Sequence, residues 1–481
     1  MRKNDGYAGR YEAVIGLEVH CELKTGTKIF CACSPKFGDE PNTHVCPVCL
    51  GMPGTLPVLS EKAVRFGVMA GLALGCDIHR RSWFDRKNYY YPDLPKGYQI
   101  TQYEQPICTG GAVSVESDGE TRSIRLTRIH LEEDAGKLIH RGEETLIDYN
   151  RAGVPLIEIV SEPDMRTPEE AKAYLNALRR ILSGIGVSDC RMNEGSLRCD
   201  VNVSVRRKGE TAYGVKCEIK NINSVNYVGK ALEDEITRQI ALVEAGERVL
   251  PETRRFNEDT GKTERMRVKE TVVDYRYFTE PNIPPIVLTE EFMEEIRHTM
   301  PPLPDEAAEG LIRDFGVKRE DAVLLTADPR ITAYFLRCAE TTAYKSVCAN
   351  LFVGELLPKM GEEAAEVLRP EWLGEICDLF GEGKIVSGTA KKLAALSSAE
   401  NESPLTIAKR QKLLKITDEQ VLAAYADEAI AANPKAVADY RKGKTAAAKQ
   451  LLGAVMRLSS GGADPVATEK ILLEKLAEQP D

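Results

Sequence analysis

The sequence has no hydrophobic run long enough to span a membrane. Its longest uncharged apolar stretch, residues 66–76, is about half the length that a membrane-spanning helix needs. The first ten residues are polar and lack the apolar core of an export signal. We therefore expect no membrane partner and a cytoplasmic location, where a reducing environment keeps the thirteen cysteines out of disulfides.

Net positive charge is lacking as well. The 481 residues include 64 Lys and Arg against 74 Asp and Glu, and the net charge of −10 argues against a general nucleic-acid coat. A local basic groove is still compatible with this composition, because affinity for phosphates depends on where the charges lie. With 43% hydrophobic and 29% charged residues, the chain is typical of a globular protein and too apolar for a disordered one.

The sequence also lacks a Walker A phosphate-binding loop. Gly261-Lys262-Thr263 and Gly443-Lys444-Thr445 resemble its end, but neither has the glycine five residues upstream that the loop requires. A nucleotide would therefore have to bind mainly through a metal ion and side chains.

Strand-like runs alternate with Gly and Pro turns up to about residue 290, and Ala, Leu, Glu and Lys dominate beyond Pro304. A polar stretch at residues 396–404, which contains a proline, indicates a second boundary. We predict an α+β fold in three parts. They are a large mixed α/β domain over residues 1–294, an all-helical domain over 295–400 and a small helical tail domain over 401–481.

Three predicted strands combine an apolar face with a face of ionisable side chains. They cover residues 13–23, 196–206 and 215–220, where apolar and polar residues alternate. The polar faces hold Glu18, His20 and Glu22 in the first strand, Arg198, Asp200 and Asn202 in the second, and Lys216, Glu218 and Lys220 in the third.

Two further segments place carboxylates where they are costly. Glu158 interrupts residues 154–160, which are otherwise apolar on both faces, and an unpaired carboxylate there would cost several kcal/mol. Glu158 therefore needs a cation or a hydrogen-bond donor. Three consecutive carboxylates, Glu132, Glu133 and Asp134, precede a glycine and a lysine.

These polar faces have two interpretations. For any one strand, a solvated sheet face with cross-strand ion pairs is the ordinary explanation. Taken together, carboxylates with a histidine and asparagines favour a hard divalent cation such as Mg²⁺, which usually accompanies phosphate substrates. The set as a whole thus indicates ATP chemistry.

Four cysteines have the spacing of a zinc site. Cys31 and Cys33 form one pair, and Cys46 and Cys49 form a second pair after a loop of twelve residues. The alternative is unpaired core thiols. Four thiolates would leave no open coordination position, so we predict a structural Zn²⁺.

Residues 83–103 combine three cations, Arg86, Lys87 and Lys96, with a tryptophan, a phenylalanine and five tyrosines. Aromatic rings interleaved with cations can hold a splayed nucleotide or an RNA end. A hydrophobic loop with surface phenols explains the same composition.

Several segments together resemble one protein family, the B subunits of the aspartyl/glutamyl-tRNA(Asn/Gln) amidotransferases. The resemblance extends over essentially the whole chain, although the tail matches mainly in length and helical character. The segments that carry it are VIGLEVHCEL (14–23), FDRKNYYYPDLPKGYQITQ (84–102), LEEDAGK (131–137), DYNRAGVPLIEIVSEP (148–163), RCDVNVS (198–204) and CEIKNIN (217–223).

The resemblance implies a cradle domain with a kinase-like site, a helical domain and a tail that grips tRNA. It implies a ligase that uses ATP and Mg²⁺ to phosphorylate the Glu or Asp carboxylate on a misacylated tRNA. Ammonia from a glutaminase partner, the amidase-type subunit, then displaces the phosphate, and a third, small subunit completes the heterotrimer. Whether Glu-tRNA(Gln), Asp-tRNA(Asn) or both are substrates is left open.

The resemblance also assigns roles to residues. It implies that His20, Glu133 and Glu158 bind the metal, that Glu18 and Asp200 belong to the same cluster, that Lys87 or Lys220 meets phosphate charge, and that Zn²⁺ on the four cysteines is a staple. Two alternatives are a non-catalytic tRNA-binding scaffold and a free-standing ligase for a small acid. The buried Glu158 argues against the first, and the helical tail argues against the second.

Overall fold

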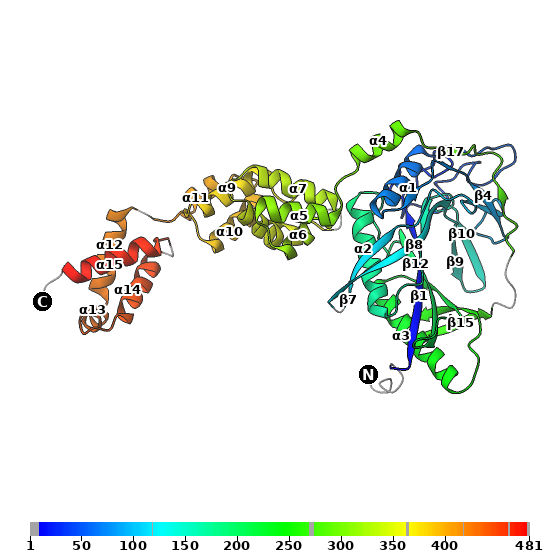
Figure 1. The fold of residues 1–481 in the computed structure, drawn as a ribbon. Coiled ribbons are helices and arrows are strands. Elements are labelled where there is room, and N and C mark those ends of the chain that lie inside the picture. Colours follow the sequence, from blue (N-terminus) through cyan, green and yellow to red (C-terminus); the bar gives the residue numbers. More distant parts are fainter. Residues whose placement is uncertain are drawn as a thin grey trace. The chain divides into compact units, whose positions relative to one another are not determined.

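The computed structural model describes residues 9–117, 119–268, 274–361, 365–416, 418–459 and 462–478. They belong to two compact units, residues 1–304 and 305–481. The first unit combines a large sheet with helices and the second is built of helices (Figure 1). This arrangement confirms the predicted α+β fold.

A mixed sheet organises the first unit. Its strands follow the order β15-β14-β13-β12-β1-β11-β8-β5-β4-β16. The bounds are β1 Tyr11–Glu22, β4 Asp85–Asn88, β5 Tyr98–Thr101, β8 Glu120–Glu133, β11 Pro155–Ser161, β12 Leu197–Arg207, β13 Cys217–Ile222, β14 Glu252–Asn257, β15 Lys262–Val268 and β16 Phe278–Thr279. Neighbours along this order pair antiparallel, except that β13 and β14 are parallel and are connected through a helix.

Short strands complete this unit. In the main sheet, β2 (Asp77–Ile78) pairs with β6 (Cys108–Thr109), and β6 and β7 (Ala112–Ser117) both pair with β8. Two separate pairs are β9 (Lys137–Arg141) with β10 (Glu144–Asp148), and β3 (Arg81–Ser82) with β17 (Ile286–Val287).

Strand β1 lies at the centre because its apolar face can be buried along the whole strand. Ile15, Leu17 and Val19 are fully or almost fully buried in the core, as the alternation predicts. The opposite face carries the polar residues, and its register is fixed by the neighbouring strands. Glu18 lies opposite Asp200 on β12, and His20 lies opposite Glu158 on β11.

Four helices belong to the first unit: α1 (Glu61–Ala73), α2 (Pro168–Gly184), α3 (Val225–Glu244) and α4 (Glu290–Thr299). Helices α2 and α3 pack against each other and bury their apolar sides in the main core (Figure 1). At the start of α2, the Thr167 side chain caps the backbone N–H of Glu170, and Pro168 occupies the first turn.

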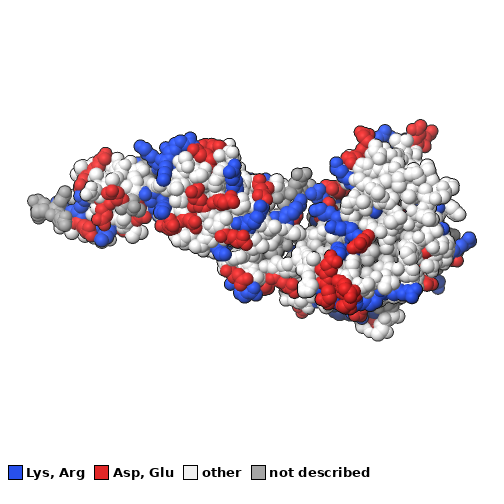
Figure 2. Space-filling model, turned by 90° about the horizontal axis from the view of Figure 1, so that it is seen from above, with Lys and Arg blue, Asp and Glu red and all other residues white. Residues whose placement is uncertain are grey.

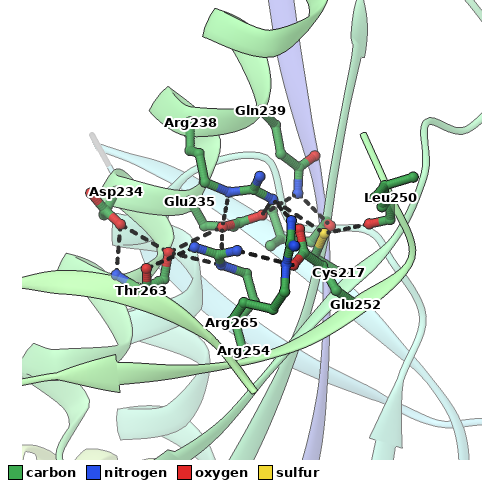
Figure 3. A network of polar contacts seen from close by, with 11 residues as sticks. Cys217, Asp234, Glu235, Arg238, Gln239, Leu250, Glu252, Arg254, Thr263 and Arg265 are labelled. Atoms are coloured by element: carbon green, nitrogen blue, oxygen red, sulfur yellow. Dashed lines mark hydrogen bonds and ion pairs between the residues drawn. The ribbon is translucent and has the colours of Figure 1, made fainter. Parts of the chain in front are cut away.

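A buried ion-pair network fastens α3 to the sheet edge (Figure 3). Glu235 of α3 is fully buried and pairs with Arg254 of β14 at 3.0 Å and with Arg238 at 2.7 Å. Glu252 of β14 lies 3.2 Å from Arg254 and 2.5 Å from Arg265 of β15. Both buried carboxylates of this network are thus held by arginines.

The second unit contains eleven α-helices among its described residues. They are α5 (Pro304–Phe315), α6 (Arg319–Leu325), α7 (Pro329–Glu340), α8 (Lys345–Leu351), α9 (Pro370–Gly381), α10 (Ser387–Glu400), α11 (Pro404–Arg410), α12 (Glu419–Ala432), α13 (Pro434–Arg441), α14 (Ala446–Leu458) and α15 (Pro465–Glu478). Two hydrophobic cores divide them, one formed by α5 to α11 and one by α12 to α15. Figure 2 shows acidic and basic side chains interleaved over these helices on the face drawn.

The boundaries between the parts differ in detail from the expected positions. The first unit ends at Pro304 rather than at residue 294, because Met293 and Ile296 of α4 are buried in its core. Ile407 and Ala408 of α11 are buried with the preceding helices, so the last core begins beyond the expected boundary at residue 400. Within the described part of the chain, no helix is both long and apolar enough to span a membrane.

Candidate active site

Three strands bring a histidine and two carboxylates together on one face of the sheet. His20 Nε2 of β1 lies 3.4 Å from Glu158 Oε2 of β11 and 3.5 Å from Glu132 Oε1 of β8. His130, also on β8, places its Nε2 atom 3.2 Å from the same Glu158 oxygen. The Thr101 hydroxyl donates a hydrogen bond to Glu132 Oε2 at 3.2 Å. We call His20, Glu132 and Glu158 the triad.

Burial makes the charges of this group interdependent. The side chains of Glu132 and His130 are each only 4% exposed. Burial alone would lower the pKa of His20, but the hydrogen bond and charge of Glu158, with Glu132, raise it to about 9. The pKa of Glu158 moves the opposite way: burial would raise it, and the two imidazoles hold it well below its usual value. His20 and His130 are thus the cationic donors that Glu158 requires in its apolar strand.

The structure does not bring Glu133 to this group. Successive side chains of a strand point to opposite faces, so Glu133 lies on the other side of β8 from Glu132. Both its carboxylate oxygens are 2.5 Å from Lys96 Nζ, and one accepts a 2.8 Å hydrogen bond from the Ile100 backbone N–H. The position expected for Glu133 is occupied by Glu132, and this is a correction to the grouping drawn from the sequence.

Glu18 and Asp200 form a second carboxylate group with Glu218 of β13, and each residue offers an oxygen within 4.8 Å of the others. Lys220 Nζ lies 2.5 Å from Asp200 and 3.0 Å from Glu218, and Asn202 donates to Glu18 at 2.9 Å. Burial, and next the charge of Glu158, raises the pKa of Glu18. The structure therefore brings Glu18, Asp200 and Lys220 together in a group of their own, next to the triad along β1, whereas the resemblance implied one cluster with His20 and Glu158.

A third group continues the same face beyond His20. Asp134 pairs with Arg198 at 2.5 Å and with Arg151 at 3.4 Å. Burial and the neighbouring Asp134 charge raise the pKa of Glu22 to about 8. Positive and negative side chains thus alternate around the triad, which gives the face both cation-binding and anion-binding groups.

Members of all three groups line a cavity of about 720 Å³ within the first unit. Its wall includes His20, Glu132 and Asp200, and Lys87 of β4 lies on it together with Tyr89. Residues 35–39, from the loop between the two cysteine pairs, form another part of the wall. A cavity of this size can hold a nucleotide or an aminoacyl group.

The donor set of the triad suits a hard divalent cation. Carboxylate oxygens are the ligands that Mg²⁺ and Mn²⁺ prefer, and Glu132, Glu158 and the His20 ring offer three donors within 4.8 Å of one another. The hydrogen bond from Thr101 orients Glu132, as outer-shell partners commonly do in metal sites.

Cys31, Cys33, Cys46 and Cys49 also lie together, with their sulfur atoms all within 4.8 Å. A hydrogen bond from the Cys31 thiol, with help from the charge of Lys28, lowers the pKa of Cys49 to about 4. Lys28 Nζ is 3.7 Å from the Cys49 sulfur. The group therefore combines four sulfur atoms close enough to share a zinc ion with an environment that favours a thiolate at Cys49, whereas burial raises the pKa of Cys33 to about 11.

Sequence reasoning missed several residues of this site. The alternation of Ile129 and Leu131 with His130 and Glu132 contained the signal for Glu132, since it places Glu133 on the apolar side. No local signal identified Arg151 as a partner of Asp134. The two residues are far apart in the sequence, and only the loop before β11 brings them together.

Comparison with known proteins gives consistent matches over nearly the whole chain. Residues 13–294 match the family model described as the GatB/GatE catalytic domain, and residues 333–476 match the GatB domain. The B subunit of an aspartyl/glutamyl-tRNA(Asn/Gln) amidotransferase from Carboxydothermus hydrogenoformans is 49% identical over 477 residues, covering 97% of this chain and 99% of that protein. A protein of the same name from Caldanaerobacter subterraneus is 50% identical over 474 residues, covering 98% and 100%. One from Persephonella marina is 46% identical over 472 residues, covering 97% and 99%.

Proposed function

The chain belongs to the GatB/GatE family of tRNA-dependent amidotransferase B subunits, and on that premise we propose that it carries the ATP-dependent step of the reaction. Its substrate would be Glu-tRNA(Gln) or Asp-tRNA(Asn). Its partners would be an amidase-type glutaminase subunit, which supplies ammonia, and a third, small subunit.

The proposed reaction has two steps. A side-chain carboxylate oxygen of the aminoacyl group attacks the γ-phosphorus of ATP, the bond to the bridging oxygen breaks, and ADP leaves. Ammonia then attacks the carbonyl carbon of the acyl phosphate, the C–O bond to the phosphate breaks, inorganic phosphate leaves, and ammonia loses a proton. The product is Gln-tRNA(Gln) or Asn-tRNA(Asn).

The residues on the cavity wall and those beside it divide this work by charge. His20, Glu132 and Glu158 would hold Mg²⁺, which neutralises phosphate charge during phosphoryl transfer. Lys220 and Lys87 are placed to offset the charge of the phosphates. Arg198 and Arg151 add guanidinium groups to the cavity wall.

One observation carries the proposal: three strands bring two nearly buried carboxylates and a histidine together, and two members of this group, His20 and Glu132, line a cavity large enough for the substrates. Phosphoryl transfer depends on positioning and charge neutralisation more than on covalent catalysis, and such a cluster supplies both.

We further propose that the four cysteines bind a structural Zn²⁺, as suits the reducing cytoplasm expected from the sequence. Binding of one Zn²⁺ by both cysteine pairs would fix the loop between them, and residues 35–39 of that loop line the cavity. The ion would thus shape the cavity without taking part in the chemistry.

A specific observation favours the alternative of a non-catalytic scaffold. Both carboxylates of the triad already have protein partners, since Glu158 lies against two imidazoles and Glu132 against Thr101 and the same rings. A network of this kind could exist for stability alone.

The deciding experiment measures ADP release by the chain assembled with its partner subunits, with and without Glu-tRNA(Gln). Glu132→Gln and Glu158→Gln should each slow tRNA-dependent ATP cleavage by about 100-fold or more, since each removes a negative charge from the proposed Mg²⁺ site. Glu120→Gln, at the exposed start of β8, is the matched control and should behave as wild type. Wild-type turnover in both variants, with tRNA still bound, would favour the scaffold.

A further inference from the structure

Four tyrosines from two distant segments form one continuous row of aromatic rings. Tyr103 and Tyr277 stack face to face, with ring centroids 3.9 Å apart and planes at 6°. Tyr275 meets Tyr277 edge to face at 6.0 Å, and Tyr89 meets Tyr275 in the same way at 6.0 Å. We call Tyr89, Tyr275, Tyr277 and Tyr103 the tyrosine ladder.

Backbone pairing holds this ladder in place. Tyr89 directly follows β4, and Tyr275 and Tyr277 directly precede β16, which pairs antiparallel with β4. The Asn88 backbone N–H donates to the Tyr275 carbonyl at 3.0 Å. The rings are therefore presented by a rigid sheet edge, which lowers the entropic cost of binding a ligand on them.

Cations lie against the ladder. Lys87 Nζ is 5.0 Å from the centroid of Tyr275 and 5.9 Å from that of Tyr89, and the Arg128 guanidinium is 5.9 Å from that of Tyr103. Tyr103 is 47% exposed, and two tyrosines that follow Tyr89 in the chain, Tyr90 and Tyr91, are 95% and 54% exposed. Exposed aromatic rings interleaved with cations are the usual chemistry for stacking single-stranded nucleic acid.

The ladder is continuous with the candidate active site. Lys87 and Tyr89 belong both to the ladder region and to the wall of the 720 Å³ cavity. In the proposed function, the amino acid that enters this cavity is attached to the 3′ end of a tRNA. The unpaired nucleotides at that end must consequently lie at the edge of the cavity.

We propose that the tyrosine ladder is the platform on which the unpaired 3′ bases of the substrate tRNA stack. This inference rests on the proposed function for the identity of the RNA. Stacking on tyrosine is tolerant of base identity, which suits an end that is common to all tRNAs. A row of four rings also fits several consecutive bases better than the single adenine of ATP.

The test uses tRNA(Gln) with 2-aminopurine in place of its terminal adenosine, whose fluorescence falls when the base stacks. The chain, assembled with its partner subunits, should quench this fluorescence. The double variant Tyr103→Leu/Tyr277→Leu should lose the quenching and bind the tRNA about tenfold more weakly or worse. Tyr103→Phe/Tyr277→Phe keeps the rings and should behave as wild type, as should Tyr213→Leu, which alters an exposed tyrosine outside the ladder.

A second measurement compares two RNAs. Removing the unpaired 3′ nucleotides from the tRNA should weaken binding to the wild type by the same factor as the double leucine substitution, and the variant should bind full-length and shortened tRNA equally. Equal affinity of the wild type for the two RNAs would overturn the proposal, and so would unchanged quenching in the variant.

The remaining outcomes separate this inference from the proposed function. Loss of ATP affinity in the leucine variant, with tRNA affinity unchanged, would identify ATP as the occupant and overturn the ladder as an RNA platform. Because quenching reports binding alone, wild-type quenching without tRNA-dependent ATP cleavage would contradict the proposed function and support the platform.

Discussion

Two clusters of buried carboxylates lie in the same sheet and differ in their partners. Glu235 and Glu252 are saturated by Arg254, Arg238 and Arg265, which remain charged at any ordinary pH (Figure 3). The triad is held by histidines instead, and the adjacent group of Glu18, Asp200 and Glu218 by a lysine; members of both groups line a cavity. The first cluster is closed, whereas in the proposed function the second would lose protons and hold a metal ion.

The two clusters even share a strand. Cys217 of β13 lies 3.6 Å from Arg238 in the arginine network, and the next residue, Glu218, points to the opposite face and pairs with Lys220. Thr253 of β14 donates to Glu218 and lies between two residues of the network, Glu252 and Arg254. The network therefore fixes the strands, and the other face of the same strands carries the candidate site.

The largest expected effect on stability follows from breaking the closed cluster. Glu235→Gln leaves buried arginines short of a carboxylate and should lower the free energy of unfolding by about 3 kcal/mol. Chemical denaturation measures this loss. ATP cleavage per folded molecule should stay near wild type, and a selective loss of activity at full stability would remove the distinction between the clusters.

Breaking the open cluster should have the opposite signature. Glu158→Gln should reduce tRNA-dependent ATP cleavage by about 100-fold, because it removes charge from the proposed cation site. Its stability should change less than that of Glu235→Gln, since the histidines can lose their protons. Steady-state kinetics and denaturation on the same preparation measure both quantities. An equal loss of stability in the two variants would show that the clusters are not different in kind.

The clusters should also differ in their response to pH. The pKa of His20 is raised from 6.5 to about 9, so its contribution to stability is complete below pH 6.5 and is lost as the pH rises through 9. In the presence of a chelator, the melting temperature should fall over this window. Glu22, with a pKa near 8, also titrates in this range, so the difference between wild type and His20→Gln isolates the histidine. If the dependence of the melting temperature on pH were the same in wild type and His20→Gln, the raised pKa of His20 would be contradicted.

A smaller effect is expected at Lys220. Lys220→Met removes the ammonium group between Asp200 and Glu218 and should raise the KM for ATP about tenfold, which corresponds to one charge-assisted hydrogen bond. Lys208→Met, at an exposed site after β12, is the control. A normal KM in Lys220→Met would place the phosphates elsewhere on the wall.

The fold could be predicted from the sequence wherever a periodic pattern was strong. Alternation in β1 and β12 identified the buried face and the polar face correctly. Val215 is an exception: it was expected on the apolar face of a strand, but it precedes β13 and is 42% exposed. Val215 follows a glycine and lies outside the strand, so the alternation of the strand residues did not determine whether its side chain is buried.

Features that depend on pairing between distant segments could not be predicted. That His20 and Glu158 lie opposite each other depends on the pairing of β1 with β11. Tyr275 and Tyr277 join Tyr89 and Tyr103 only because β16 pairs with β4, which no local pattern indicates. The Glu235 network likewise arises from the packing of α3 on two strands that follow it in sequence.

Binding of Mn²⁺ as a substitute for Mg²⁺, followed by electron paramagnetic resonance, would distinguish the open cluster from the closed one without relying on turnover. We predict that wild type and Glu235→Gln bind Mn²⁺ at a single tight site and that Glu158→Gln and Glu132→Gln lose it. Equal Mn²⁺ binding by all four proteins would show that the open cluster is not a cation site, and the difference between the two clusters would then carry no functional meaning.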